Sequence, residues 1–135
     1  MASAPQSPTA RDRTEGAKQL VRRMIDEVMN AGRLDVLDEL YAPEMATAAR
    51  RWIEPFRAAF PDVHMDIVLL VAEDDVVAGR FRCSGTQLGP WDGQPATGRR
   101  FTNVDEVYFF TIADGRIAAA WGLEDNDRRR RQLGM

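Results

Sequence analysis

Residues 99–122, RRFTNVDEVYFFTIADGRIAAAWG, contain the clearest strand pattern in the chain. A run rich in aromatic and β-branched residues, Arg99 to Ile112, is followed by the turn Ala113-Asp114-Gly115 and a second apolar run, Arg116 to Gly122. Two such runs joined by a short turn containing Asp-Gly are typical of an antiparallel hairpin. Strand alternation divides the first run into two faces, with Asn103, Asp105, Val107 and Phe109 on one and Thr102, Val104, Glu106, Tyr108 and Phe110 on the other.

A second hairpin is expected upstream of this one. Its strands run from Val63 to Glu73 and from Val76 to Thr86, with a tight turn at Asp74-Asp75. A loop rich in glycine and proline, 87–98, connects this hairpin to the long strand. The sequence therefore predicts about four antiparallel strands with hairpin connections.

Helical patterns come before the strands. Apolar residues at three- and four-residue spacing predict a helix that begins at Thr14, its N-cap, and ends before Gly32, and a short second helix over 34–41. A third helix is predicted over 47–59, but Pro55 lacks a backbone donor, so the helix either kinks there or begins close to Glu54.

The length of 135 residues fits one domain. Residues 1–13 hold serine and proline with little to bury and are predicted to be a disordered tail, so the single domain spans 14–135. A last short helix ends near Leu133, with Asp125 or Asn126 as its cap. Helices followed by antiparallel strands predict an α+β fold, in which the helices cover one face of a curved sheet and leave an apolar mouth for a small molecule.

Composition excludes several classes of function. The 18 basic and 21 acidic residues give a net charge of −3, which argues against a binder of the nucleic-acid backbone. One cysteine, Cys83, and one histidine, His64, cannot build a structural zinc site or an intrachain disulfide, so no metal is expected. No stretch is long and apolar enough to cross a bilayer, and the chain is predicted to be cytoplasmic.

Short motifs along the chain resemble the SnoaL-like polyketide cyclase family of the nuclear transport factor 2-like superfamily. The resemblance covers roughly residues 15–134 in the same order. The motifs that carry it are Ala59-Phe60-Pro61-Asp62, Gly85-Thr86, Pro95-Ala96-Thr97-Gly98-Arg99-Arg100, Asp114-Gly115-Arg116-Ile117, Trp121-Gly122-Leu123-Glu124-Asp125 and Arg131-Gln132-Leu133-Gly134.

The resemblance implies a cone-shaped sheet, a homodimer formed through its outer face, and a role in antibiotic biosynthesis or other secondary metabolism. Cyclases of this family close a ring of an aromatic polyketide ester by intramolecular aldol chemistry, without a metal or organic cofactor. Their acid/base Asp corresponds to Gly122 here, and their pocket His and Gln correspond to Tyr108 and Glu106. The segment 42–51 is also shorter than is usual in the family and lacks its His.

These correspondences select the candidate catalytic residues. A carboxylate in an apolar cavity, as expected for Glu106, has a raised pKa and can move protons to or from carbon. Tyr108 could donate a hydrogen bond to a developing enolate oxygen. Asp125 is either the proton carrier of the Trp-Gly-x-x-Asp motif or simply the N-cap of the last helix.

Three further residues are candidates for substrate binding. Arg80 and Arg82 lie two apart on one strand and share a face. If that face lines the cavity, they hold an acidic substrate group or keep Glu106 ionised, and Arg80 with Tyr108 stabilises the oxyanion; otherwise both meet solvent. Trp121 either packs in the wall or stacks on an aromatic ligand. Two alternatives to a cyclase stay open, a cofactor-independent hydroxylase of anthracycline type and a noncatalytic domain for small-molecule binding or dimerisation, because Gly122 replaces the acid/base.

Overall fold

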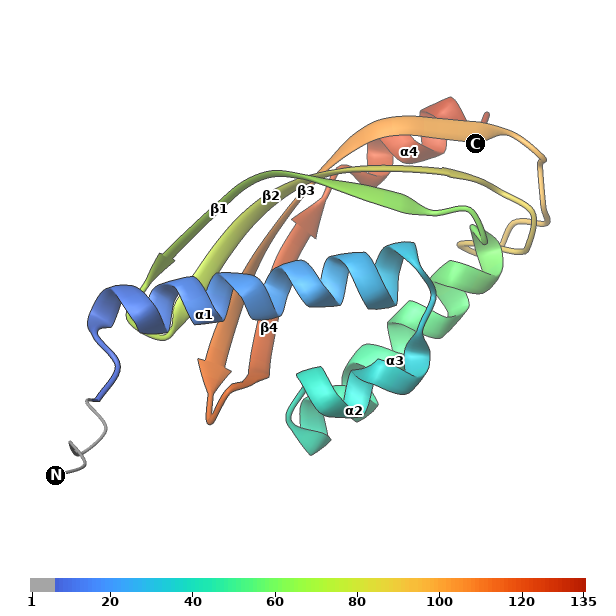
Figure 1. Cartoon of the computed structure of the whole chain (residues 1–135). Coiled ribbons are helices and arrows are strands. Elements are labelled where there is room, and N and C mark those ends of the chain that lie inside the picture. Colours follow the sequence, from blue (N-terminus) through green and yellow to red (C-terminus); the bar gives the residue numbers. More distant parts are fainter. Residues whose placement is uncertain (1–6) are drawn as a thin grey trace, which may run out of the picture.

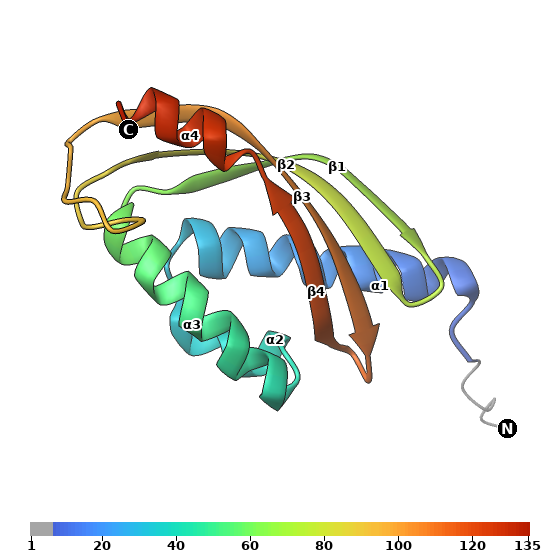
Figure 2. The same ribbon diagram turned by 180° about the vertical axis from the view of Figure 1, so that it is seen from behind.

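The computed structural model describes residues 7–135, in which helices pack on the concave side of one curved antiparallel sheet (Figure 1 and Figure 2). The helical segments are α1 (Ala10–Arg23), a π-helical continuation η1 (Met24–Asn30), a 3₁₀ turn η2 (Leu34–Val36), α2 (Leu37–Leu40), α3 (Pro43–Ala59) and α4 (Asn126–Gln132). The strands are β1 (His64–Glu73), β2 (Val76–Thr86), β3 (Arg100–Ala113) and β4 (Arg116–Glu124). This confirms the predicted α+β class.

The four strands form a meander in the order β1-β2-β3-β4, each antiparallel to its neighbour. Each strand pair contains one register irregularity. Because a bulge bends its strand and increases the local twist, these irregularities help to curl the sheet around the helices. The strand bounds agree closely with those predicted, except that β4 continues past Gly122 to Glu124.

The first helix begins earlier than predicted. Thr9, rather than Thr14, is its N-cap, because the Thr9 hydroxyl accepts from the Asp12 backbone N–H at 3.0 Å while the Asp12 carboxylate accepts from the Thr9 N–H at 3.2 Å. The helix therefore includes Ala10 to Arg13, within the segment 1–13 that was predicted to be a tail. Residues 1–6 of that prediction lie outside the described residues.

The third helix also begins before the predicted start at Thr47. Pro43 occupies the first helical turn, where a missing N–H breaks no intrahelical bond. The helix then continues through Pro55, on its exposed side, because Ala46, Ala49 and Ile53 bury a continuous stripe on the other side. Packing of that stripe holds the helix together across the lost hydrogen bond.

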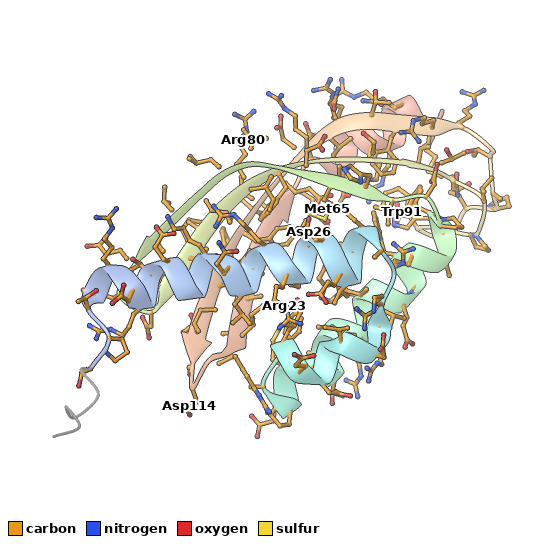
Figure 3. The ribbon with its side chains drawn as sticks, viewed as in Figure 1. Arg23, Asp26, Met65, Arg80, Trp91 and Asp114 are labelled. Carbon is orange, nitrogen blue, oxygen red and sulfur yellow. The ribbon has the colours of Figure 1, made fainter. Side chains whose placement is uncertain are left out.

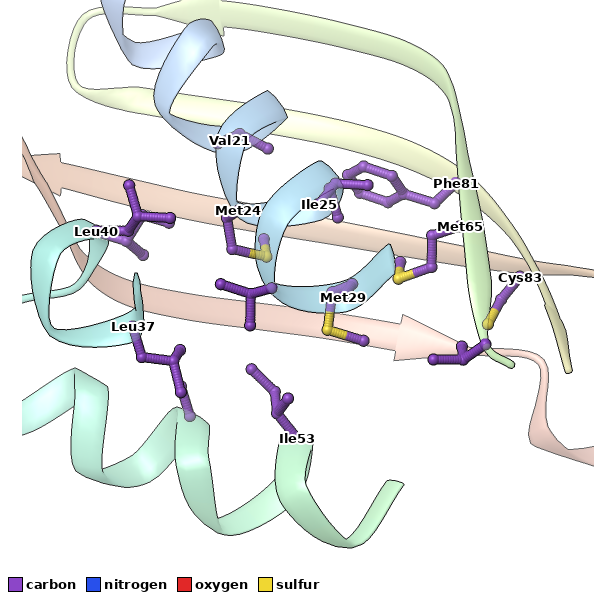
Figure 4. Packing of buried hydrophobic residues seen from close by; sticks show 14 of the residues in the cluster. Val21, Met24, Ile25, Met29, Leu37, Leu40, Ile53, Met65, Phe81 and Cys83 are labelled. Carbon is purple, nitrogen blue, oxygen red and sulfur yellow. The ribbon is translucent and has the colours of Figure 1, made fainter. Parts of the chain in front are cut away.

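The core lies between the helices and the concave face of the sheet (Figure 4). From the helices the core includes Val21, Met24, Ile25, Met29, Leu37, Leu40 and Ile53, and from the strands Met65, Phe81 and Cys83. Fully burying one aliphatic side chain, such as that of a leucine, stabilises a fold by about 1.5–3 kcal/mol. Among the described residues, no helix is both long and apolar enough to cross a membrane.

Three of the sequence motifs share a structural role. The Asp62 carboxylate accepts from the Thr86 N–H and hydroxyl, both at 2.7 Å, and pairs with the Arg100 guanidinium at 3.1 Å. Asp62 thus ties the start of β1 to the end of β2 and the beginning of β3. The motif residues Asp62, Thr86 and Arg100 hold three strand ends together and lie away from the cavity described next.

Candidate functional site

A cavity of about 260 Å³ lies between the helices and the concave face of the sheet. Its walls are thioethers, alkyl groups and aromatic rings, and among the described lining residues Tyr41 and Tyr108 bring the only hydroxyl groups. The π-helical segment η1 contributes three of its residues, Met24, Ile25 and Met29. The other lining residues are Tyr41, Met45, Trp52, Met65, Tyr108, Phe110, Ala120, Trp121 and Gly122.

Two carboxylates flank the hydroxyl of Tyr108, a residue that lines the cavity. The register of β3 and β4 pairs Glu106 with Glu124 and Tyr108 with Gly122, so the two glutamates and the tyrosine share the concave face. The Tyr108 Oη lies 3.1 Å from Glu106 Oε1 and 2.8 Å from Glu124 Oε1. A phenol has one hydrogen to donate, so two ionised carboxylates cannot both be satisfied by it. The arrangement therefore favours one proton shared within the group.

Glu106 also forms a buried ion pair with Arg129 of α4. The guanidinium Nη2 donates to Glu106 Oε2, and Nη1 donates to Asn126 Oδ1. Both partners of the ion pair are almost completely inaccessible to solvent, with side-chain exposures of 0% and 3%. The Arg129 Nε has no hydrogen-bond partner among the described residues. Aromatic rings surround this guanidinium, those of Phe101, Phe56 and Trp91, at 4.7, 5.3 and 5.9 Å from their centroids.

Burial and neighbouring charges bring the pKa of Glu106 close to neutral pH. Burial, followed by the negative charge of Glu124, raises the pKa of Glu106 to about 7, against the opposing effect of Arg129. Burial and the two glutamates also raise the pKa of Tyr108, so its phenol stays protonated and remains a donor. Burial raises the pKa of the Cys83 thiol as well, which disfavours the thiolate that a nucleophile would require.

The raised pKa of Glu106 predicts a pH-dependent stability. Between its ordinary value of 4.5 and about 7, the folded protein binds more protons at this site than the unfolded chain. The contribution of Glu106 to the free energy of unfolding should be full below about 4.5 and be lost as the pH rises through about 7. Urea unfolding across this range should show that decline in the wild type. The double variant Glu106→Leu/Arg129→Met should lack this component, and identical pH slopes in the two proteins would contradict it.

Gly122 accommodates the ring of Tyr108. A Cβ at position 122 would lie 3.0 Å from Tyr108 Cγ and still closer to Cδ1 and Cε1, which real side chains do not tolerate. The large ring at Tyr108 therefore occupies the space that a side chain at Gly122 would need.

Gly122→Ala is accordingly expected to lower the free energy of unfolding by about 1–3 kcal/mol, because the ring must leave its rotamer. Chemical denaturation of the variant measures this effect. Gly16→Ala is the matched control, since a Cβ at that position on α1 meets nothing within 4 Å. Adding Tyr108→Ala to Gly122→Ala should remove most of the strain, and strictly additive effects would show that the two residues do not interact.

The structure separates the sequence candidates into those that meet at the cavity and those that do not. Glu106 and Tyr108 lie together, as described above. Asp125 does not join them, because its carboxylate accepts from the Arg128 N–H at 3.1 Å and caps α4. Of the two roles considered for Asp125, the geometry shows the N-cap.

Arg80 and Arg82 lie on the opposite face of the sheet, and neither lines the cavity. Figure 3 shows Arg80 pointing away from the helices, whereas Met65 lies between the sheet and α1. Arg80 pairs there with Asp105 at 3.0 Å. The expectation that these arginines hold an acidic group in the cavity is therefore wrong, because the helices cover the face that carries Phe81 and Cys83.

Trp121 borders the cavity from the edge strand β4, yet its side chain is largely on the outer face. Its ring lies 5.8 Å from that of Phe109, and the residue is 58% exposed. Trp52 of α3, which the sequence analysis did not select, contributes a second indole to the cavity and also lines an adjoining hollow of about 430 Å³.

Sequence reasoning also missed Glu124, Arg129 and Tyr41. Glu124 could have been found by continuing the alternation of the last strand two residues beyond Gly122. Arg129 stands in a run of four arginines, 128–131, that is typical of a solvated helix face, and its burial depends on where α4 packs. Tyr41 stands at the end of the predicted helix 34–41 and was not selected as a site residue.

Comparison with known proteins places the fold among the polyketide cyclases. A sequence profile described as SnoaL-like polyketide cyclase matches residues 19–133. The aklanonic acid methyl ester cyclase DnrD of Streptomyces peucetius is 29% identical, across 85% of this chain and 88% of that enzyme. DauD of Streptomyces sp. (strain C5), also an aklanonic acid methyl ester cyclase, is 30% identical, across 82% of this chain and 67% of its own. The structure of TsrD from Streptomyces laurentii superposes with a TM-score of 0.75 at 32% identity, across 89% of this chain and 96% of that one.

Proposed function

The chain belongs to the SnoaL-like polyketide cyclase family, and on this premise we propose that it is a cofactor-independent enzyme of secondary metabolism, such as antibiotic biosynthesis. Its substrate is an aromatic polyketide-type small molecule, and its reaction is an aldol cyclisation driven by proton transfer next to a carbonyl. The observation that carries the proposal is the Tyr108 hydroxyl, which stands at an apolar cavity within hydrogen-bond distance of both Glu106 and Glu124.

In the proposed reaction Glu124 is the base. Its carboxylate removes a proton from the carbon next to a carbonyl, the enolate carbon attacks a second carbonyl, and a carbon–carbon bond forms. The resulting alkoxide takes the proton back, so the product is an isomer of the substrate. Tyr108 orients the Glu124 carboxylate, and the buried Arg129 guanidinium offsets the charge of Glu106 beside it.

The positions of the two hollows support this assignment. Glu124 lines the hollow of about 430 Å³, Tyr108 lines the cavity of about 260 Å³, and Trp52 lines both. A substrate that extends past Trp52 from one to the other would bring its reacting carbons to the Tyr108–Glu124 pair. The Tyr108 side of the pair faces the apolar cavity, whereas Glu124 is exposed in a hollow that also contains Asp92 and Arg130.

Mass spectrometry of the protein incubated with aklanonic acid methyl ester tests the proposal, with boiled protein as the control. A product of unchanged mass and a new retention time is the expected result. A mass increase of one oxygen atom would instead support the hydroxylase alternative. Saturable binding with the compound recovered unchanged would overturn the proposed reaction and favour a noncatalytic binding domain.

We also propose that the protein is a homodimer, paired through the outer face of the sheet. That face exposes a contiguous group of apolar side chains on β3 and β4, which a monomer would leave in water. Its members are Val107, Phe109, Trp121 and Leu123. Light scattering should report twice the chain mass of 15.2 kDa, and Phe109→Arg should shift the protein towards monomer. A wild-type protein that runs as a monomer would contradict the dimer.

We place this function in the cytoplasm. Cys83 is buried and is the sole cysteine of the chain, a composition that suits a reducing compartment.

A further inference from the structure

We propose that the Tyr41 hydroxyl is the anchoring donor of the cavity, and that it binds a carbonyl oxygen of an uncharged, planar aromatic ligand. The inference deepens the proposed function by naming the ligand chemistry and the residue that recognises it. It rests on that function only for the general class of ligand, and its test requires no turnover.

The backbone at Tyr41 is held firmly in place. The Tyr41 N–H closes the end of α2 on the Leu37 carbonyl at 2.9 Å. The next residue, Ala42, donates to the Ile117 carbonyl at 2.9 Å, and Tyr41 forms an isolated bridge with Ile117 of β4. These contacts fix the point from which the Tyr41 side chain reaches the cavity wall.

Tyr41 is only 1% exposed, and the part of the chain that the structure describes gives its hydroxyl no hydrogen-bond partner. Among the described residues the one fully buried polar side-chain atom without a partner is Arg129 Nε, so the Tyr41 hydroxyl is not sealed off and opens on the cavity. Burial alone raises the pKa of Tyr41, with no contribution from any hydrogen bond. A hydroxyl in this position takes its hydrogen-bond partner from water or from a ligand in the cavity. A hydroxyl that opens on a cavity and is bonded to no other protein group is therefore suited to donate to a ligand.

Tyr108 cannot take this role as readily, because its hydroxyl hydrogen is already engaged by Glu106 or Glu124. The two phenols that line the cavity thus differ in what they offer. Tyr108 belongs to the proton-transfer group, whereas the hydrogen of Tyr41 is available to an acceptor such as a carbonyl oxygen.

The remaining walls define the rest of the ligand. Among the described lining residues none is charged, so a carboxylate inside the cavity would lose its hydration without gaining a cation. The rings of Trp52 and Tyr108 both line the cavity and are nearly parallel to each other, with an interplanar angle of 14°, so they offer a flat molecule two parallel surfaces to pack against. An ester or quinone fits this lining, and a free acid does not.

Binding of three probes to the wild type and to Tyr41→Phe tests the inference, followed by quenching of tryptophan fluorescence. The probes are 9,10-anthraquinone, anthracene, which has the same ring system without carbonyls, and anthraquinone-2-carboxylate. Tyr41→Phe should weaken anthraquinone binding about 3- to 10-fold, the effect of one hydrogen bond, and leave anthracene binding unchanged. The wild type should bind the carboxylate at least about 10-fold more weakly than anthraquinone, because of the charge.

A matched variant and a stability measurement separate binding from structure. Met45→Leu changes another lining side chain at similar volume and should affect anthraquinone and anthracene alike. The thermal midpoint of Tyr41→Phe should be no lower than that of the wild type, because no protein partner loses a bond.

Three results would overturn the inference: no anthraquinone binding by the wild type, equal anthraquinone affinity in the wild type and Tyr41→Phe, or equal weakening of anthraquinone and anthracene with a lower thermal midpoint. Failure of the proposed reaction has a different signature. In that case anthraquinone still binds through Tyr41 while the polyketide ester is recovered unchanged.

Discussion

Replacing Glu106 with leucine is expected to lower the free energy of unfolding by about 3–5 kcal/mol, because it leaves the buried Arg129 guanidinium without its carboxylate. Arginine cannot release its proton in a protein, so the charge stays. Arg129→Met should cost less at neutral pH or below, since the stranded Glu106 can take up a proton, its pKa being already raised by burial. The buried pair is thus expected to respond asymmetrically to loss of either partner.

The double variant Glu106→Leu/Arg129→Met should recover most of the lost stability, because apolar replacements of a buried ion pair are often neutral. Urea unfolding of the four proteins gives a double-mutant cycle in which the two losses are strongly non-additive. Arg128→Met, at the exposed neighbouring position of α4, is the matched control and should change stability by no more than about 0.5 kcal/mol. Additive losses in the cycle would show that the pair does not form.

Glu124→Gln is expected to reduce kcat by about 10²- to 10⁴-fold, the contribution of a positioned acid/base. Glutamine keeps the shape and a hydrogen bond to Tyr108 but cannot accept the proton. Stability should hardly change, since Glu124 is exposed and takes no part in the buried ion pair. This makes Glu124→Gln a cleaner test of chemistry than any change at Glu106.

Two neighbouring variants sharpen that experiment, each followed by its turnover rate and its denaturation midpoint. Asp127→Asn removes a nearby carboxylate that is 79% exposed and, among the described residues, pairs only with Arg131, and it should leave kcat unaltered. Asp125→Asn distinguishes a proton-carrying role of Asp125 from an N-capping role, because asparagine is as good an N-cap as aspartate but cannot carry the proton. If the large loss appears in Asp125→Asn while Glu124→Gln stays active, the assignment of Glu124 as the base is wrong.

Local patterns were enough to predict the sheet. Hairpins join neighbouring segments through short turns, so the Asp114-Gly115 turn and the alternation of β3 together placed Glu106 and Tyr108 on one face. The helix starts were harder, because Thr9 and Pro43 act through caps and first turns that differ little from ordinary loop residues.

Period-two alternation along a strand shows which residues share a face of the sheet, but not which face is buried. The sequence by itself therefore determined that Arg80 and Arg82 share one face of their strand, and that Glu106 and Tyr108 share one face of theirs. Which face is covered depends on where the helices pack, and only the tertiary structure decided that Arg80 meets solvent while Glu106 is buried. The same packing brought Arg129 of α4 onto Glu106 and closed a cavity around Tyr41, because contacts between segments far apart in the chain arise only when the sheet curls over its helices.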